Sequence, residues 1–163
     1  MEGESRAGTI PDAHWETLAV ILETLRGQDL LWVVTGSVSL ALQGVPVAPN
    51  DIDLQTTAEG AFLMERLFAP YMVRPVVYSA VERIRSQFGA FILNGIEVEI
   101  IGDIQKRRDD GGWTAAPDLE QLRIFVAANG RRIPILPLEY EAEAYAQLGK
   151  AERAEELLSW LAR

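Results

Sequence analysis

A short apolar run that ends in a glycine-serine pair is the feature that most constrains the fold of this chain. Residues 30–35 (Leu-Leu-Trp-Val-Val-Thr) suit a buried strand, and Gly36 permits a sharp turn after it. Ser37 is suited to cap a helix over residues 38–43. A helix N-terminus presents unpaired backbone N–H groups, and a small residue before it lets an anion approach the main chain closely. The pattern therefore predicts a strand–turn–helix unit that binds phosphate at its corner.

Two aspartates follow this unit with one residue between them. Asp51 and Asp53 lie in a short segment of strand character, residues 51–54, so pleating points both carboxylates to one side. Adjacent carboxylates repel each other unless cations neutralise them, and Mg²⁺ prefers hard oxygen ligands. The pair is therefore a candidate metal site. By itself the spacing is also typical of a solvated strand end, with Asn50 and Asp51 in an ordinary turn.

A predicted hairpin further along the chain supplies a third acidic group. Residues 88–101 contain two strands around a two-residue Asn-Gly turn. Glu97 and Glu99 share one face of the second strand. An ordinary half-buried sheet also alternates acidic and apolar residues, and that alternative remains open for Glu97. Glu99 is the stronger candidate because two isoleucines follow it, where a solvated face would place another polar residue.

With these elements the chain resembles the nucleotidyltransferase superfamily that includes DNA polymerase beta, and within it the minimal, antibiotic-modifying and toxin-antitoxin types. The resemblance rests on residues 35–37 (Thr-Gly-Ser), residues 51–54 (Asp-Ile-Asp-Leu) and residues 95–100 (Gly-Ile-Glu-Val-Glu-Ile). It covers about residues 30–104. It implies an α/β (α+β) nucleotidyltransferase fold, with a mixed, mostly antiparallel sheet flanked by helices and a C-terminal helical hairpin.

The resemblance also implies roles for particular residues. Gly36 and Ser37 would hold a nucleoside triphosphate. Asp51, Asp53 and Glu99 would be the catalytic acids and would bind two Mg²⁺ ions, or Mn²⁺ in their place. An NMP group would then pass to a hydroxyl of an acceptor, with release of pyrophosphate.

Basic residues for the triphosphate are not found where the resemblance places them. Many relatives have an arginine shortly before the first acid, whereas the segment between Ser37 and Asp51 has no basic residue, and Glu99 stands where aspartate is common. We therefore expect the triphosphate charge to be neutralised from elsewhere. Arg85, just ahead of the strand that pairs with the Glu99 strand, and Lys106, shortly after Glu99, are the candidates. Solvated surface charge is the alternative for both.

Composition excludes several classes of function. The 163-residue chain has a formal net charge of −9, which argues against an extended nucleic-acid partner because such binding relies on Lys and Arg at phosphates. A small-molecule or protein acceptor fits better. The absence of cysteine excludes disulfides, thiolate-bound zinc and cysteine nucleophiles. The single histidine, His14, is expected in solvent or at a helix start. Without a long apolar stretch or a targeting signal, a cytoplasmic protein with no membrane contact is expected.

The chain is expected to form one domain. Residues 1–10 are predicted to be a flexible leader, and residues 11–163 a single nucleotidyltransferase-like domain. Its core is placed at residues 30–136 and its C-terminal helices at residues 137–162. In those helices the acidic residues are predicted to form a solvated face; they are Glu139, Glu141 and Glu143.

Two functions from different classes follow from this sequence. The first is a metal-dependent nucleotidyltransferase that acts on a hydroxyl of a small molecule or a protein. The second is a non-catalytic interaction module that keeps the same fold, in a toxin-antitoxin or regulatory pair. The missing base ahead of Asp51 favours the second, and the three acids at compatible positions favour the first. The oligomeric state is not predicted.

Overall fold

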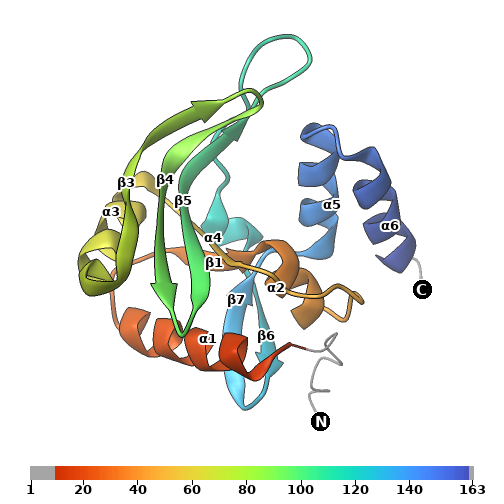
Figure 1. The fold of residues 1–163 in the computed structure, drawn as a ribbon. Helices are drawn as coiled ribbons and strands as arrows, with labels where there is room; N and C mark the ends of the chain where they lie inside the picture. The colour runs from red at the N-terminus through yellow and green to blue at the C-terminus, as the bar shows by residue number, and fades with distance from the viewer. Residues whose placement is uncertain (1–9, 162–163) are drawn as a thin grey trace.

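A seven-stranded sheet forms the centre of the computed structural model, which describes residues 10–161 (Figure 1). The strand order is β3-β4-β5-β2-β1-β7-β6. Pairing is parallel between β1 and β7 and between β2 and β5, and antiparallel between the other neighbours, so the predicted mixed, mostly antiparallel sheet is confirmed. The strands are β1 Trp32–Thr35, β2 Ile52–Thr56, β3 Met72–Val81, β4 Ile84–Leu93, β5 Ile96–Lys106, β6 Ile124–Ala128 and β7 Arg131–Ile135.

Helices flank the sheet, and the last two form a hairpin beside it (Figure 1). The predicted C-terminal helical hairpin corresponds to α5 and α6, which pack on each other. Gly149 separates them with a φ of 78°, a conformation that favours glycine. The helices are α1 Asp12–Leu25, α2 Gly36–Leu42, α3 Ala58–Leu67, α4 Leu119–Leu122, α5 Leu138–Gln147 and α6 Ala151–Leu161, with a 3₁₀ turn at Ala69–Tyr71.

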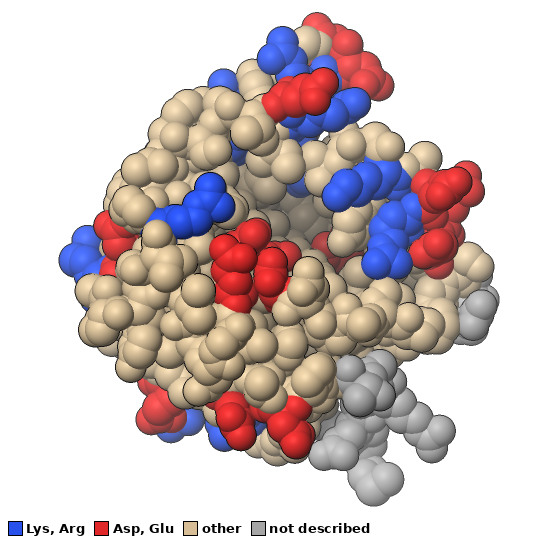
Figure 2. All heavy atoms as spheres, viewed as in Figure 1, with Lys and Arg blue, Asp and Glu red and all other residues tan. Residues whose placement is uncertain are grey.

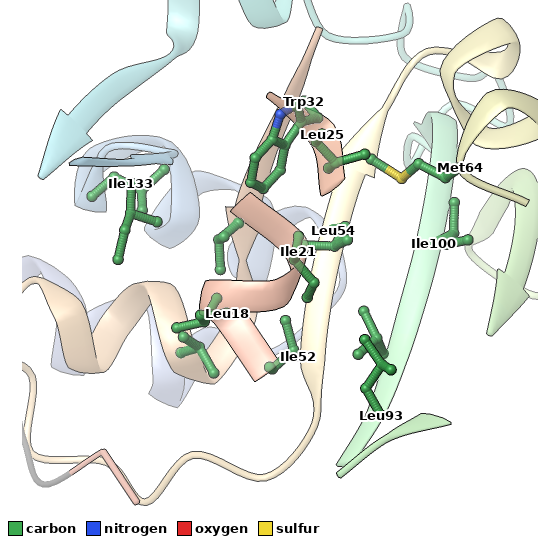
Figure 3. Packing of buried hydrophobic residues seen from close by; sticks show 14 of the residues in the cluster. Leu18, Ile21, Leu25, Trp32, Ile52, Leu54, Met64, Leu93, Ile100 and Ile133 are labelled. Carbon is green, nitrogen blue, oxygen red and sulfur yellow. The ribbon is translucent and has the colours of Figure 1, made fainter. Parts of the chain in front are cut away.

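The main core lies between the sheet and helices α1 and α3 (Figure 3). Leu18 and Ile21 lie three residues apart on α1, so both point to the sheet, and both are fully buried. They pack in one cluster with Met64 of α3, Leu54 of β2 and Ile100 of β5. Each such buried side chain stabilises the fold by about 1.5–3 kcal/mol. This packing fixes which face of β2 and β5 points away from the helices.

Alternation along the two central strands therefore sends the acidic residues to the opposite face. In the parallel pairing of β2 with β5, Ile52 lies beside Val98 and both are fully buried. The next pair is Asp53 and Glu99, which are only partly buried. Successive side chains of a strand point to opposite faces, so the alternating sequence already separates the apolar residues of β2 and β5 from their acidic residues.

The ends of the chain and His14 differ from the sequence prediction. Residues 1–9 of the predicted leader lie outside the described residues, and Ile10 is buried in the core. His14 is in the first turn of α1, as expected, but it is buried instead of solvent-facing. In the buried position its Nε2 makes a hydrogen bond of 2.6 Å with the carbonyl oxygen of Asn50, a distant segment that packs on α1. Among residues 10–161, no helix has both the length and the apolar character needed to span a membrane.

Candidate active site

A row of five paired residues crosses the sheet on the face opposite α1 and α3. Arg74 of β3 pairs with Ala90 of β4, which pairs with Glu99 of β5. Glu99 pairs with Asp53 of β2, which pairs with Thr35 at the end of β1. Paired residues in adjacent strands point to the same face. Strand pairing thus brings together an arginine, two acids and the end of β1, although they are far apart in the sequence.

The acids converge beside this row. Carboxylate oxygens of Asp51, Glu97 and Glu99 lie within 4.8 Å of one another. Asp53 makes a side-chain hydrogen bond with Glu99. Acidic side chains form a compact group on this face in Figure 2, next to a hollow. The structure therefore brings together the three predicted acids and adds Glu97. The sequence signal for Glu97 was its i, i+2 spacing from Glu99.

The environment of Asp53 disfavours its charge. Burial, followed by the neighbouring Glu99 and Asp51, raises the pKa of Asp53 to about 8. Burial also raises the pKa of Glu99, while its hydrogen bond with Asp53 acts in the opposite direction. The raised pKa favours the protonated form of Asp53, whose carboxyl then donates the hydrogen bond to Glu99. Four acidic groups so close together concentrate negative charge that a divalent cation would neutralise.

The glycine corner fits tightly against this cluster. Gly36 has a φ of 72°, which confirms the predicted sharp turn. Ser37 does not cap the helix as predicted, because α2 already begins at Gly36 and the cap position is Thr35, without a side-chain cap. The Ser37 Oγ instead accepts a hydrogen bond of 3.3 Å from the backbone N–H of Asn50. The Ser37 side chain therefore holds the segment that leads to Asp51.

Glu141 of α5 contacts the same corner and is not on a solvated face as predicted. It is 4% exposed, and its Oε1 accepts a hydrogen bond of 2.6 Å from Thr35 Oγ1. Its carboxylate also accepts from the backbone N–H of Gly36. Burial raises the pKa of Glu141 to about 7, while these hydrogen bonds act to lower it. One backbone donor that we expected to face phosphate is therefore bound to Glu141.

The two predicted basic residues lie on different faces of the sheet. β5 contains an irregularity at Asp103, where φ is 50° and the pairing with β4 shifts by one residue. After it, Lys106 points to the α5 side, where it is buried with its Nζ 5.3 Å from the centre of the Tyr140 ring. Arg85 instead donates to Gln105 Oε1 at 2.9 Å. Arg85 also stacks on a tryptophan, with its Cζ 4.5 Å from the Trp113 ring centre.

Arg85 also lines a cavity of about 210 Å³ together with Ala58 of α3 and Gly102. Gly102 packs against α3, so this cavity lies on the α3 side. The structure therefore brings Lys106 towards the corner and does not bring Arg85 to the acidic cluster.

Other basic residues near the acids were missed by the sequence prediction. Arg74 is close enough to Glu99 to lower the pKa of that carboxyl. Lys150 and Arg153 line a cavity of about 590 Å³ at the junction of α5 and α6, together with Tyr145. Figure 2 shows basic side chains over α5 and α6 across the hollow from the acidic group. The helical hairpin places Lys150 and Arg153 there, the strand pairing places Arg74, and no local sequence pattern marked any of the three.

Comparison with known proteins agrees with this geometry. A family model of aminoglycoside-2''-adenylyltransferases matches residues 17–159. The chain belongs to this family. The match to the adenylyltransferase family includes the glycine corner, all four acids, all of α5 and all but the last two residues of α6. No curated protein matched the chain.

Two solved structures resemble this member of the adenylyltransferase family. The crystal structure of a candidate nucleotidyltransferase from Thermotoga maritima is 47% identical in sequence, with a TM-score of 0.84, and the alignment covers 94% of this chain and 96% of that one. The lincosamide antibiotic adenylyltransferase LnuA, with lincomycin bound, is 12% identical, with a TM-score of 0.56 over 91% of this chain and 98% of that one. The second likeness concerns the fold alone. The predicted nucleotidyltransferase superfamily and fold are confirmed, and nucleotidyl transfer is the activity class of the family.

Proposed function

We propose that this protein transfers an NMP group, with AMP as the first candidate, from a Mg²⁺-bound nucleoside triphosphate to a hydroxyl of a small molecule and releases pyrophosphate. The observation that supports this most directly is the convergence of Asp51, Glu97 and Glu99 within 4.8 Å, beside the hydrogen-bonded Asp53. Membership of a family named for adenylyl transfer supports the same reaction.

The acidic cluster fits a divalent cation of the Mg²⁺ or Mn²⁺ kind. All donors are carboxylate oxygens, which are the ligands that hard cations prefer. Asp51, Glu97 and Glu99 would hold the metal, and Asp53 would join them on losing its proton. When bound, the metal would neutralise the charge of the phosphates and lower the pKa of the acceptor hydroxyl.

The residues of the chain then have separate tasks. The acceptor oxygen forms a bond to the α-phosphorus as the bond to the pyrophosphate oxygen breaks. The hydroxyl proton passes to Glu99, which lies near Arg74 and has a raised pKa that suits a general base. Lys106, Lys150 and Arg153 compensate for the missing base ahead of the first acid by neutralising the triphosphate from the α5–α6 side.

The acceptor class follows from the family and from the charge of the site. The family is named for adenylylation of aminoglycosides, and LnuA for adenylylation of lincosamide antibiotics, so a hydroxylated antibiotic is the first class to test. The acidic cluster would attract a cationic acceptor and repel an anionic one. A protein hydroxyl is the second acceptor class.

The test is transfer of label from [α-³²P]ATP in Mg²⁺ buffer to a panel of aminoglycosides and lincosamides, with mass spectrometry of the product. We expect a nucleotidylated acceptor that does not form with EDTA or with the Asp53→Ala variant. Crystals soaked with Mg²⁺ and a non-hydrolysable ATP analogue should show ordered triphosphate next to Asp51 and Asp53. An empty site in those crystals, together with no transfer, would show that the assignment is wrong.

One observation favours a non-catalytic interaction module as the second candidate. The Gly36 N–H is already bound to the buried Glu141, and no basic residue precedes Asp51. In such a module the fold would serve as a scaffold in a toxin-antitoxin or regulatory pair. The crystal soak separates the two candidates, because a scaffold needs neither metal nor triphosphate.

A further inference from the structure

The single histidine of the chain contacts the segment that leads to the first acid. His14 is 6% exposed, and its Nε2 lies 2.6 Å from the carbonyl oxygen of Asn50, the residue before Asp51. A carbonyl oxygen only accepts hydrogen bonds, so Nε2 is the donor in this contact. The other ring nitrogen, Nδ1, is buried and has no hydrogen-bond partner among the residues from 10 to 161. Among the described residues, the Asn50 carbonyl is therefore the one hydrogen-bond partner of the His14 ring.

Asn50 is held through both of its backbone groups. Its carbonyl accepts from His14, and its N–H donates to Ser37 Oγ at 3.3 Å. Residues 45–50 have no helix or strand, and β2 begins only at Ile52. The position of Asp51 therefore depends on these two side-chain contacts instead of on a strand ladder ahead of it.

The next turn of α1 holds the second segment that supplies acids. Thr17 is fully buried, and its hydroxyl proton is shared between the carbonyl oxygen of Ala13, 2.8 Å from Oγ1, and that of Leu93, 3.3 Å away. The Thr17 Oγ1 in turn accepts a hydrogen bond of 3.4 Å from the Asn94 side-chain amide. Leu93 and Asn94 lie at the turn between β4 and β5, just ahead of Glu97. Helix α1 thus contacts both segments from which the cluster is built.

We infer that His14 is a positioning residue that fixes Asp51 relative to Glu97 and Glu99 through the Asn50 carbonyl. This inference rests on the proposed function in so far as the cluster binds a metal. His14 does not touch the reacting atoms. Its effect is geometric, because residues that orient metal ligands from outside typically change metal affinity or activity by about 10–100-fold when they are replaced.

The test compares three replacements of His14 with one control on the same helix. His14→Phe keeps a ring and removes the donor, and His14→Asn keeps an amide that is too short to reach Asn50. His14→Gln places an amide nitrogen near the position of Nε2 and should restore the contact. The control, Ile21→Val, removes one buried methylene from α1 without altering a polar contact.

The first readout is Mn²⁺ binding, followed by electron paramagnetic resonance of the free ion. We expect Mn²⁺ to bind about 10-fold more weakly to His14→Phe and His14→Asn, and nearly normally to His14→Gln and Ile21→Val. The inference is wrong if His14→Phe and His14→Asn bind Mn²⁺ as the unmodified protein does. It is also wrong if Ile21→Val, with a loss of thermal stability similar to that of the His14 variants, loses as much affinity for Mn²⁺ as they do.

The second readout does not need a metal and separates this inference from the proposed function. Amide hydrogen exchange of residues 50–53 should become faster in His14→Phe and His14→Asn and stay unchanged in Ile21→Val. Unchanged exchange in these His14 variants would overturn the positioning role, whatever the metal result. If exchange becomes faster but the unmodified protein binds no Mn²⁺, the positioning role holds and the proposed function fails.

Discussion

Gly36 and Asp53 are in such close contact that a Cβ atom on Gly36 would overlap the Asp53 carboxylate. The carboxylate therefore occupies the space that any other residue at position 36 would fill. Gly36 also has a φ of 72°, in the left-handed region. The glycine is thus required twice, once for the turn after β1 and once for the position of an acid on β2.

Replacing Gly36 by alanine should be much more harmful than replacing a glycine with the same backbone conformation. Gly27 has a φ of 73° and no atom within 4 Å of the Cβ position, so Gly27→Ala should cost only about 1–2 kcal/mol. Gly36→Ala should cost about 3 kcal/mol or more, because overlap with Asp53 adds to the backbone strain. Chemical denaturation of both variants measures the difference. Equal losses would show that the overlap is relieved at little cost.

Asp53→Asn should abolish nucleotidyl transfer while the metal-free protein stays at least as stable. An asparagine amide can donate to Glu99 as the protonated Asp53 does, and it has no charge to bury. Transfer should fall by at least about 1,000-fold, because a ligand next to the developing charge is lost. Label transfer and thermal unfolding are the measurements. The unmodified protein should gain thermal stability with Mg²⁺, and the variant should not.

Glu97→Gln should weaken metal binding although the sequence favoured Glu99 over Glu97. Glu97 contributes one of the three oxygens within 4.8 Å, so we expect Mn²⁺ to bind about 10-fold more weakly. The matched control is Glu59→Gln on the exposed surface of α3, which changes net charge equally. Calorimetric titration measures both. The same loss in the control would assign the effect to overall charge instead of ligation.

The stability of the protein should fall with rising pH through Glu141. The pKa of this buried carboxyl is about 7 in the folded protein and near 4.5 in the unfolded chain. Between these two pKa values the folded protein binds more protons at this group than the unfolded chain does. The free energy of unfolding therefore decreases as pH rises through this range. The full size of this decrease is about 3 kcal/mol at most. Denaturation of the unmodified protein and of Glu141→Gln from pH 5 to pH 8 should show the variant gaining relative stability as pH rises, whereas parallel curves would exclude this linkage.

Basic residues should divide into those that affect ATP affinity and those that do not. Arg85→Ala should leave affinity for a non-hydrolysable ATP analogue unchanged, because Arg85 contacts Gln105 and Trp113 on the α3 side. Lys150→Met combined with Arg153→Met should weaken affinity about 10-fold or more, because the proposed triphosphate site loses two cationic groups that line the α5–α6 cavity. Fluorescence titration with a labelled analogue measures each variant. Weaker binding in Arg85→Ala alone would reverse the assignment.

Much of the fold follows from short-range patterns. The Asn-Gly turn between β4 and β5, the turn at Gly36, and the alternation in β2 and β5 all appear where the sequence predicts them. These features depend on the conformational freedom of glycine and asparagine and on the two-residue period of a strand. Both properties belong to residues that are close in sequence.

Other features depend on contacts between distant segments. Glu141 matches a solvated helix face in pattern, but the packing of α5 on the glycine corner buries it. His14 has no neighbour in sequence that predicts its contact with Asn50. The irregularity at Asp103 exchanges the faces of β5, so Lys106 lies towards α5, on the opposite side of the sheet from the cavity that Arg85 of β4 lines. None of these contacts has a periodic signal.

The sequence alone marked the acids at positions 51, 53 and 99 as candidates and determined the glycine turn and the hairpin around the Asn-Gly turn, because local backbone preferences and side-chain alternation depend on neighbouring residues. Only the tertiary structure decided that β2 and β5 pair in parallel with Asp53 beside Glu99, and that Glu97 joins the cluster. Strand register between distant segments is set by packing of the whole core, which no short window of sequence contains.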